Sequence, residues 1–237
     1  MGDTEMIKTA LLAIAALALV APLANAASNT TDKLYPELRA FVDARRAEFG
    51  QIPPERRELL DGLADYVKGR YEAGETSYLN FVCTHNSRRS HMSQLFAQAA
   101  SAVYGIPART YSGGTESTAF NPRAVAAIER AGFDVLKTSD DANPVYLVKL
   151  SGGSMPMPCF SKKYDGAPNP KLEFAAIMVC DEADEACPYV PGADARFAIP
   201  FVDPKISDNT PAEAATYDER AAQIAREFLY VFDRASR

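Results

Sequence analysis

One short string of the sequence combines residue types that can attack an anion. Cys83 is followed six positions later by Arg89 and then by Ser90. The apolar run 78–82 before the cysteine predicts a buried strand, and apolar residues at helical spacing after Arg89 predict a helix. The string therefore lies where a strand ends and a helix begins.

A loop at such a junction can bind an oxyanion, because backbone N–H groups converge on the anion and the helix dipole adds positive potential. The same field favours the thiolate of a cysteine, which makes Cys83 a candidate nucleophile rather than only a buried thiol. Arg89 can bind two oxygens of a tetrahedral anion, and Ser90 can donate to the thiolate. The candidate anion ligands are contiguous: Thr84, His85, Asn86, Ser87, Arg88, Arg89 and Ser90. Among them, Asn86 suits a position with positive φ.

A leaving group at this site would need a proton donor, and Asp203 is a candidate. It precedes Pro204 after a predicted strand, at the sheet edge where the sites of α/β proteins gather. An aspartate before a proline is also common in an Asx-turn, so both roles remain open for Asp203.

Strands alternate with helices from Tyr78 onward, which predicts an α/β fold with helices on both faces of a parallel sheet. The expected strands are 78–82, 109–111, 174–179 and 197–201. One helix is expected from Arg89, a second after the N-cap Asn121, and a last one that contains the apolar stripe from Tyr217 to Val231.

The sequence divides into three parts. Residues 1–26 have a basic start, a short apolar run and a small-x-small end, which is typical of a secretory signal peptide, and residues 27–76 form a linker and a helical extension. Residues 77–237 form the main domain, with a hairpin insertion at about 144–172 that contains Cys159. The apolar run is shorter than the ~20 residues of a membrane span, so we expect export to the periplasm and no stable membrane anchor.

The composition narrows the class of partner. The chain has 25 Lys+Arg against 31 Asp+Glu, a net charge of −6, which argues against nucleic-acid binding. Four cysteines in 237 residues are too few for a disulfide framework. We expect no cofactor and no metal, since the six residues between Cys180 and Cys187 are not a usual zinc-ligand spacing.

Four ordered motifs resemble the low-molecular-weight protein tyrosine phosphatases and, more closely, the thioredoxin-coupled arsenate reductases. They are the loop 82–90, the paired segments 112–116 and 121–125, the cysteine pair within 179–188, and Asp203-Pro204. The resemblance runs from residue 78 to the C-terminus except for the hairpin. It implies a three-layer αβα fold with a four-stranded parallel sheet, and it implies that Asp203 is the general acid.

Three positions depart from the family pattern. His85 stands where the family usually has glycine, and it either lines the entrance or lies on the surface. Arg88 stands where a second cysteine is frequent; we expect a solvated arginine there rather than a cation at the loop mouth. Lys205 replaces the aromatic residues that stack on phosphotyrosine, which argues against that ligand.

The resemblance to the reductases implies a thiol relay. Cys83 would attack arsenate, Cys180 would attack Cys83, and Cys187 would then form a Cys180–Cys187 disulfide that a thioredoxin-like reductant reopens. We favour this relay because a three-thiol pattern is specific. The carboxylates at 181–185, in a polar and mobile stretch, would raise the pKa of the two thiols.

Two alternatives remain. Hydrolysis of a phosphomonoester through a cysteinyl-phosphate needs only Cys83, Arg89 and Asp203, and leaves Cys180 and Cys187 for a structural disulfide. Export favours hydrolysis, because cytosolic thioredoxin cannot reach an exported enzyme. A module that binds an oxyanion or senses redox state, without turnover, would need the loop alone.

Overall fold

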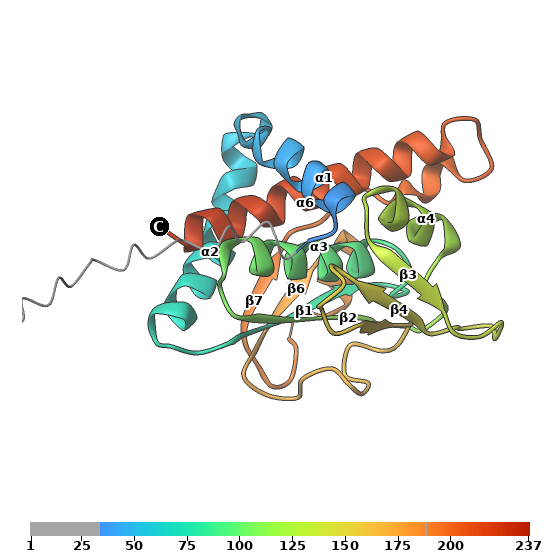
Figure 1. The fold of residues 1–237 in the computed structure, drawn as a ribbon. Coiled ribbons are helices and arrows are strands. Elements are labelled where there is room, and N and C mark those ends of the chain that lie inside the picture. Colours follow the sequence, from blue (N-terminus) through green and yellow to red (C-terminus); the bar gives the residue numbers. More distant parts are fainter. Residues whose placement is uncertain (1–33, 188) are drawn as a thin grey trace, which may run out of the picture.

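The computed structural model describes residues 34–187 and 189–237 (Figure 1). The expected signal peptide (1–26) and the expected linker (27–32) lie outside these residues. A parallel sheet of four strands forms the centre, in the order β2-β1-β6-β7. The strands are β1 (Ser77–Cys83), β2 (Ala108–Gly114), β6 (Phe174–Met178) and β7 (Ala193–Ala198). The predicted strands at 78–82, 109–111 and 174–179 are confirmed, whereas the strand predicted at 197–201 begins earlier and ends at Ala198.

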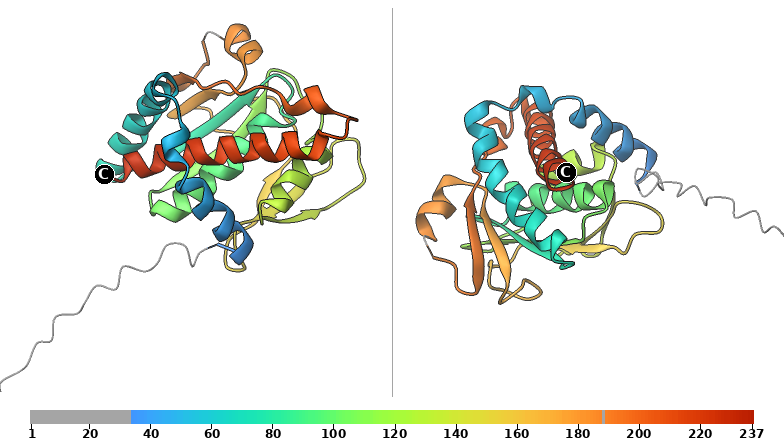
Figure 2. Two further views of the ribbon diagram at one scale, coloured as in Figure 1. Left: turned by 90° about the horizontal axis from the view of Figure 1, so that it is seen from above. Right: turned by 90° about the vertical axis from the view of Figure 1, so that its left-hand side faces the viewer.

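Long helices cover one face of this sheet (Figure 1). They are α2 (Pro54–Glu72), α3 (Arg89–Tyr104) and α6 (Glu213–Ala235), and the views in Figure 2 show them on the same side of the strands. The ring of Phe81 on β1 meets the ring of Phe228 on α6 edge-on, with centroids 4.9 Å apart. Burial of such side chains provides the main stabilisation of the domain.

The N-terminal extension packs onto this helical layer. After α1 (Pro36–Arg46) and a 3₁₀ turn, η2 (Phe49–Gln51), α2 lies against α6, and the backbone N–H of Tyr35 donates to Leu150 O at 2.8 Å. Leu38 and Val42 of α1 are fully buried. The predicted helical extension is therefore confirmed: it consists of α1 and α2, and buried residues of both helices belong to the core.

A second, antiparallel sheet holds the predicted hairpin and one further strand. It has the order β3-β4-β5, from β3 (Asp134–Lys137), β4 (Tyr146–Lys149) and β5 (Met157–Cys159). β3 follows α4 (Pro122–Arg130) directly and pairs with β4. The hairpin thus extends a strand of the main domain.

The predicted α/β fold with a four-stranded parallel sheet is confirmed, and the two faces of the sheet are covered differently. Segment 160–172, which follows β5, runs across the opposite face (Figure 1). There Asn80 Nδ2 on β1 donates to Tyr164 O at 3.0 Å. A Cβ on Gly113 would lie 2.2 Å from Tyr164 Cα, so the loop backbone occupies the space that a helix would need.

Two short helices complete the carboxyl end of the sheet. α5 (Asp181–Ala186) follows β6, and the 3₁₀ helix η3 (Pro204–Ser207) follows β7. Within the described part of the chain, no helix combines the length and the apolar character that crossing a membrane requires.

Candidate active site

The loop between β1 and α3 turns its backbone carbonyls outward. Cys83 O accepts from Thr115 N at 3.2 Å, Thr84 O accepts from Glu116 N at 2.8 Å, and Ser87 O accepts from Asn121 N at 2.9 Å. In a trans peptide the C=O and the next N–H point in opposite directions. The amides that follow these carbonyls therefore face the hollow of the loop, as an anion-binding site requires.

Asn86 fixes the turn inside this loop. Its φ is 44°, the left-handed conformation predicted for this asparagine. Asn86 Nδ2 donates to Ser90 Oγ at 2.8 Å, and Ser90 Oγ lies 3.1 Å from Cys83 Sγ. All three side chains are buried, so the hydroxyl is held where it can donate to the Cys83 thiolate.

The insertion supports the loop from outside. The backbone N–H of Lys162 donates to Asn86 Oδ1 at 2.9 Å, and Ser161 Oγ donates to His85 O at 2.9 Å. Gly114 N in turn donates to Lys162 O at 2.9 Å. Nothing in the sequence of segment 160–163 had marked it as part of the site, because its contribution is made largely by backbone atoms and by one serine.

Gly114 lets the end of β2 approach the loop. A Cβ at this position would lie 2.7 Å from both Asn86 N and Thr84 O, and 2.3 Å from Glu116 O. No side chain fits there, which gives a physical reason for the glycine at the end of this strand.

Arg89 connects the loop to the segment after β7. Its side chain is 8 % exposed; Nη1 donates to Phe201 O at 3.0 Å, and Nη2 lies 2.9 Å from Asp203 Oδ2. Glu182 Oε2 is 3.8 Å from the same Nη2. The structure thus brings together Arg89 and Asp203, which are separated by more than 100 positions in the sequence, and adds Glu182, which the sequence analysis had not singled out as a site residue.

Asp203 combines the two roles that the sequence left open. Its Oδ1 accepts from Lys205 N at 3.0 Å, the bond of an Asx-turn, and caps η3. Its Oδ2 faces Arg89. The turn therefore orients a partly exposed carboxyl toward the anion-binding arginine, where a proton donor for a leaving group would have to lie.

Arg88 is not the solvated arginine that we expected. Its Nε donates to Tyr217 Oη at 2.7 Å and its Nη2 donates to Asp208 Oδ2 at 3.1 Å. Tyr217 Oη also donates to Asp208 Oδ1 at 2.8 Å. The Arg88 guanidinium is thus hydrogen-bonded to Tyr217 of α6 and to Asp208. The Asp208 carboxylate balances its charge, so the guanidinium does not face the anion site. The interpretation was wrong because both partners lie about 120 or more positions away.

The remaining loop side chains differ in exposure. His85 is exposed, and its Nε2 lies 3.7 Å from Glu116 Oε2, so it occupies the surface beside the loop. Thr84 is half-buried, and its Oγ1 lies 3.6 Å from Cys180 Sγ. Ser87 is buried and contributes its carbonyl to the bond with Asn121.

Cys180 lies beside the loop and Cys187 lies at the far end of α5. The expected mobile stretch between them is a short helix, with Cys180 as its N-cap and Cys187 as its C-cap. Burial raises the pKa of Cys180, opposed by the nearby Arg89 guanidinium and the Thr84 hydroxyl. Burial also raises the pKa of Cys187, opposed by Arg196. The predicted direction of both shifts is confirmed, but burial causes them rather than the neighbouring carboxylates.

Geometry of this kind defines enzymes that attack a tetrahedral oxyanion with a cysteine thiolate. Sequence comparison with known proteins supports the same class of enzyme. Over 141 residues the chain is 30% identical to the arsenate reductase of Bacillus licheniformis, covering 59% of this chain and 83% of that protein. It is 25% identical over 146 residues to the arsenate reductase of Bacillus subtilis, covering 62% of this chain and 87% of that protein.

The chain therefore belongs to the low-molecular-weight protein tyrosine phosphatase and arsenate reductase family. The chain is also similar to the crystal structure of a low-molecular-weight protein tyrosine phosphatase from T. tengcongensis, at 18% sequence identity and a TM-score of 0.43. The similarity covers 67% of this chain and 96% of that one. No family model matches the sequence.

Proposed function

We propose that this enzyme reduces arsenate by a three-thiol relay in which Cys83 is the nucleophile. One observation carries the proposal: the Cys180 thiol lies at the wall of the anion-binding loop, 3.6 Å from Thr84 Oγ1. β6, which leads to Cys180, is the direct neighbour of β1, which leads to Cys83. Hydrolysis of a phosphate ester would make no use of a thiol at this place.

The electrons and atoms balance as follows. The Cys83 thiolate forms a bond to arsenic and one arsenate oxygen leaves as water, with Asp203 as the proton donor. The Cys180 thiolate attacks Cys83 sulfur; the sulfur–arsenic bond breaks, its electron pair stays with arsenic, and arsenite departs. Cys187 then attacks Cys180, which frees the Cys83 thiolate and leaves a Cys180–Cys187 disulfide. A dithiol reductant resets the pair.

The last exchange requires α5 to unwind. Seven residues along a helix separate the two cysteine Cα atoms by about 10 Å, whereas a disulfide needs its Cα atoms within about 7 Å. The helix has only six residues, and its carboxylates lie mostly on the surface, so little packing opposes unwinding. Formation of the disulfide would therefore change the shape of the surface beside the loop.

Hydrolysis of a phosphomonoester is the second candidate. Two observations favour it: Arg89 and Asp203 are already side by side, and burial raises the pKa of Cys180, which lowers the fraction of attacking thiolate. In this case Cys83 would form a cysteinyl-phosphate that water hydrolyses, and α5 would not take part.

The proposal also includes a reductant that reopens the Cys180–Cys187 disulfide. A thioredoxin-like dithiol protein would suit the relay in chemistry. If the chain is exported, as its first 26 residues suggest, that protein must act in the periplasm.

The test is a pair of assays on the reduced protein. One follows arsenate reduction with a thioredoxin system, and the other follows hydrolysis of an aryl phosphate. Under the proposal, Cys180→Ser and Cys187→Ser abolish steady-state arsenate reduction, while Cys83→Ser abolishes both activities. The matched control is Cys159→Ala, because Cys159 is a fully buried cysteine of the insertion and has no place in the relay.

Mass spectrometry of the arsenate-treated protein adds a direct readout, since the wild type should accumulate a Cys180–Cys187 disulfide and Cys187→Ser a Cys83–Cys180 disulfide. Aryl phosphate hydrolysis without any arsenate turnover would replace the proposal by the second candidate. Binding of phosphate without either activity would contradict both reactions.

A further inference from the structure

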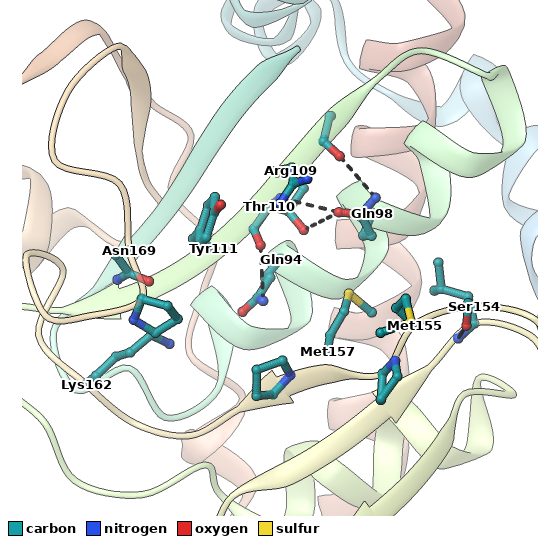
Figure 3. A pocket seen from close by; sticks show the side chains of 15 residues that line it. Gln94, Gln98, Arg109, Thr110, Tyr111, Ser154, Met155, Met157, Lys162 and Asn169 are labelled. Carbon is teal, nitrogen blue, oxygen red and sulfur yellow. Dashed lines mark hydrogen bonds between the residues drawn. The ribbon is translucent and has the colours of Figure 1, made fainter.

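A cavity of about 400 Å³ lies at the outer edge of the parallel sheet, apart from the catalytic loop (Figure 3). One wall is formed by α3 and the edge strand β2, and the other is formed by the insertion, which contributes Met155, Met157 and Lys162. In Figure 3 the methionines lie across the cavity from Gln94 and Gln98 of α3. None of the residues used in the proposed reaction lines this space.

The free edge of β2 is already hydrogen-bonded by side chains. Gln98 Nε2 donates to Ala108 O at 3.2 Å, and Gln98 Oε1 accepts from Thr110 N at 3.3 Å. Gln94 Nε2 donates to Thr110 O at 3.2 Å. Because these glutamines occupy the positions of an added strand, an extended peptide would find no backbone partners here.

The charged side chains that line the cavity are both basic. The chain carries 31 Asp+Glu, yet among residues 34–187 and 189–237 no carboxylate lines the cavity, whereas Arg109 and Lys162 both do. Lys162 is 7 % exposed, and within the described residues its ammonium has no salt bridge and donates only to Phe160 O at 3.3 Å. The ammonium also lies 4.7 Å from the centroid of the Phe160 ring, a contact that supplies no negative charge. Burial without a counter-ion lowers the pKa of Lys162 to about 8. A ligand anion would supply the missing partner.

We infer that this cavity binds a small organic anion with an apolar body. The anionic group would pair with Lys162 and Arg109, and the apolar body would lie against Met157 and its flanking prolines. The backbone of Lys162 bonds Asn86 of the loop, but its side chain lines this cavity. The site contains no residue that the proposed reaction uses, so it stands whether or not that reaction is correct.

Anilinonaphthalene sulfonate is a suitable probe, because it has an anionic sulfonate and two apolar ring systems. N-phenylnaphthylamine shares that skeleton without the sulfonate. Because the sulfonate would lose its buried cationic partner, we expect Lys162→Met to weaken binding of the sulfonate about tenfold or more. Binding of the neutral amine should change less than threefold. Lys163→Met, at an exposed neighbouring lysine, should leave both unchanged.

The position of the probe can be measured directly, because the chain contains no tryptophan. A tryptophan introduced by Met155→Trp, at an 85 % exposed rim residue, should transfer its excitation to the bound sulfonate. Leu59→Trp places the donor on α2, which packs near β7 at the opposite edge of the sheet, and should transfer less.

Three results would overturn the inference: equal transfer from both tryptophans, equal affinity of the wild type for the charged and the neutral compound, or an unchanged affinity for the sulfonate in a folded Lys162→Met. Arg109→Gln tests binding of the anionic group without changing the buried lysine, so its result does not depend on whether Lys162→Met folds. Its side chain is exposed, and its loss should weaken the sulfonate several-fold without altering thermal stability; an unchanged affinity in this variant contradicts the role given to Arg109.

Discussion

The loop from Cys83 to Arg89 is bonded to its surroundings on several sides, whereas the α5 segment from Cys180 to Cys187 is a short helix held mainly at its ends. The carbonyls of the loop are taken by segment 115–121 and by the insertion. On α5 only Ala183 is buried, and Arg196 secures the C-terminal end through bonds to Asp184 and to Cys187 O.

The loop and the α5 segment have different tasks in the proposed reaction. Attack on an oxyanion benefits from groups fixed before the substrate arrives. A thiol that must carry a disulfide outward benefits from a segment that can move at small cost. We therefore expect substitutions in the loop to abolish chemistry, and substitutions around α5 to change how fast the relay proceeds.

The largest effect is expected at the nucleophile. Cys83→Ser should lower both arsenate reduction and aryl phosphate hydrolysis by at least about 10⁴-fold, because every proposed step begins on that sulfur. Phosphate should still raise the thermal midpoint of the variant, since the loop amides and Arg89 remain. Activity within tenfold of the wild type would show that another group attacks.

Asp203→Asn should have the next largest effect. Loss of the proton donor should lower kcat about 10²–10⁴-fold for phenyl phosphate, and much less for dinitrophenyl phosphate, whose leaving group needs no proton. Asp218→Asn, at an exposed ion pair with Arg130, is the control and should change neither rate. An equal loss on both esters would assign Asp203 to holding Arg89 instead.

Gly114→Ala tests the rigidity of the loop. The added methyl would press on the backbone at Asn86 and Thr84, and overpacking of this kind costs about 1–3 kcal/mol of unfolding free energy. We expect a lower thermal midpoint and weaker phosphate binding, measured by calorimetry. Gly152→Ala is the matched control, since a Cβ there meets nothing within 4 Å. Unchanged phosphate affinity in Gly114→Ala would show that the loop adapts.

The pH dependence should distinguish the two regions. Because burial raises the pKa of Cys180 and of Cys187, both thiols stay protonated to a higher pH than usual, and their thiolate fraction grows as pH rises. The rate of Cys180–Cys187 disulfide formation, followed by rapid acid quench, should therefore rise up to about tenfold per pH unit. Aryl phosphate hydrolysis needs neither thiol and should lack this rise; a shared profile would contradict the separation.

Arg196→Gln should have the smallest effect. It removes the bonds from β7 to the C-terminal end of α5, and one such bond contributes about 1 kcal/mol. We expect amide hydrogen exchange in α5 to become several-fold faster while the loop amides keep their protection. Arg130→Gln, at a surface pair, should leave α5 unchanged. Faster exchange in the loop as well would show that the two regions are coupled.

The parts of the fold that depend on local pattern could be predicted from the sequence. The apolar run before Cys83 and the helical spacing after Arg89 located the loop, and the residue type of Asn86 indicated its backbone conformation. The strand order could come only from the resemblance, because no local pattern encodes which strands are neighbours.

The parts that depend on distant partners could not be predicted. Arg88 forms its bonds with residues of the last helix and of the preceding turn, and its own neighbours in the sequence give no sign of them. Lys162 supports the loop through its backbone N–H, which every residue except proline possesses. The helix between Cys180 and Cys187 lacks an apolar stripe, so its charge suggested a mobile loop instead.

Segment 160–163 limits which residues can be deleted from this enzyme. Removing 144–172 to obtain a minimal version of the family fold would delete the backbone N–H that bonds Asn86 and the strand-like pairing between Gly114 and Lys163. It would also uncover the side of β1 that Tyr164 covers. A protein engineer should therefore treat the insertion as scaffold for the nucleophile, and shorten the chain elsewhere.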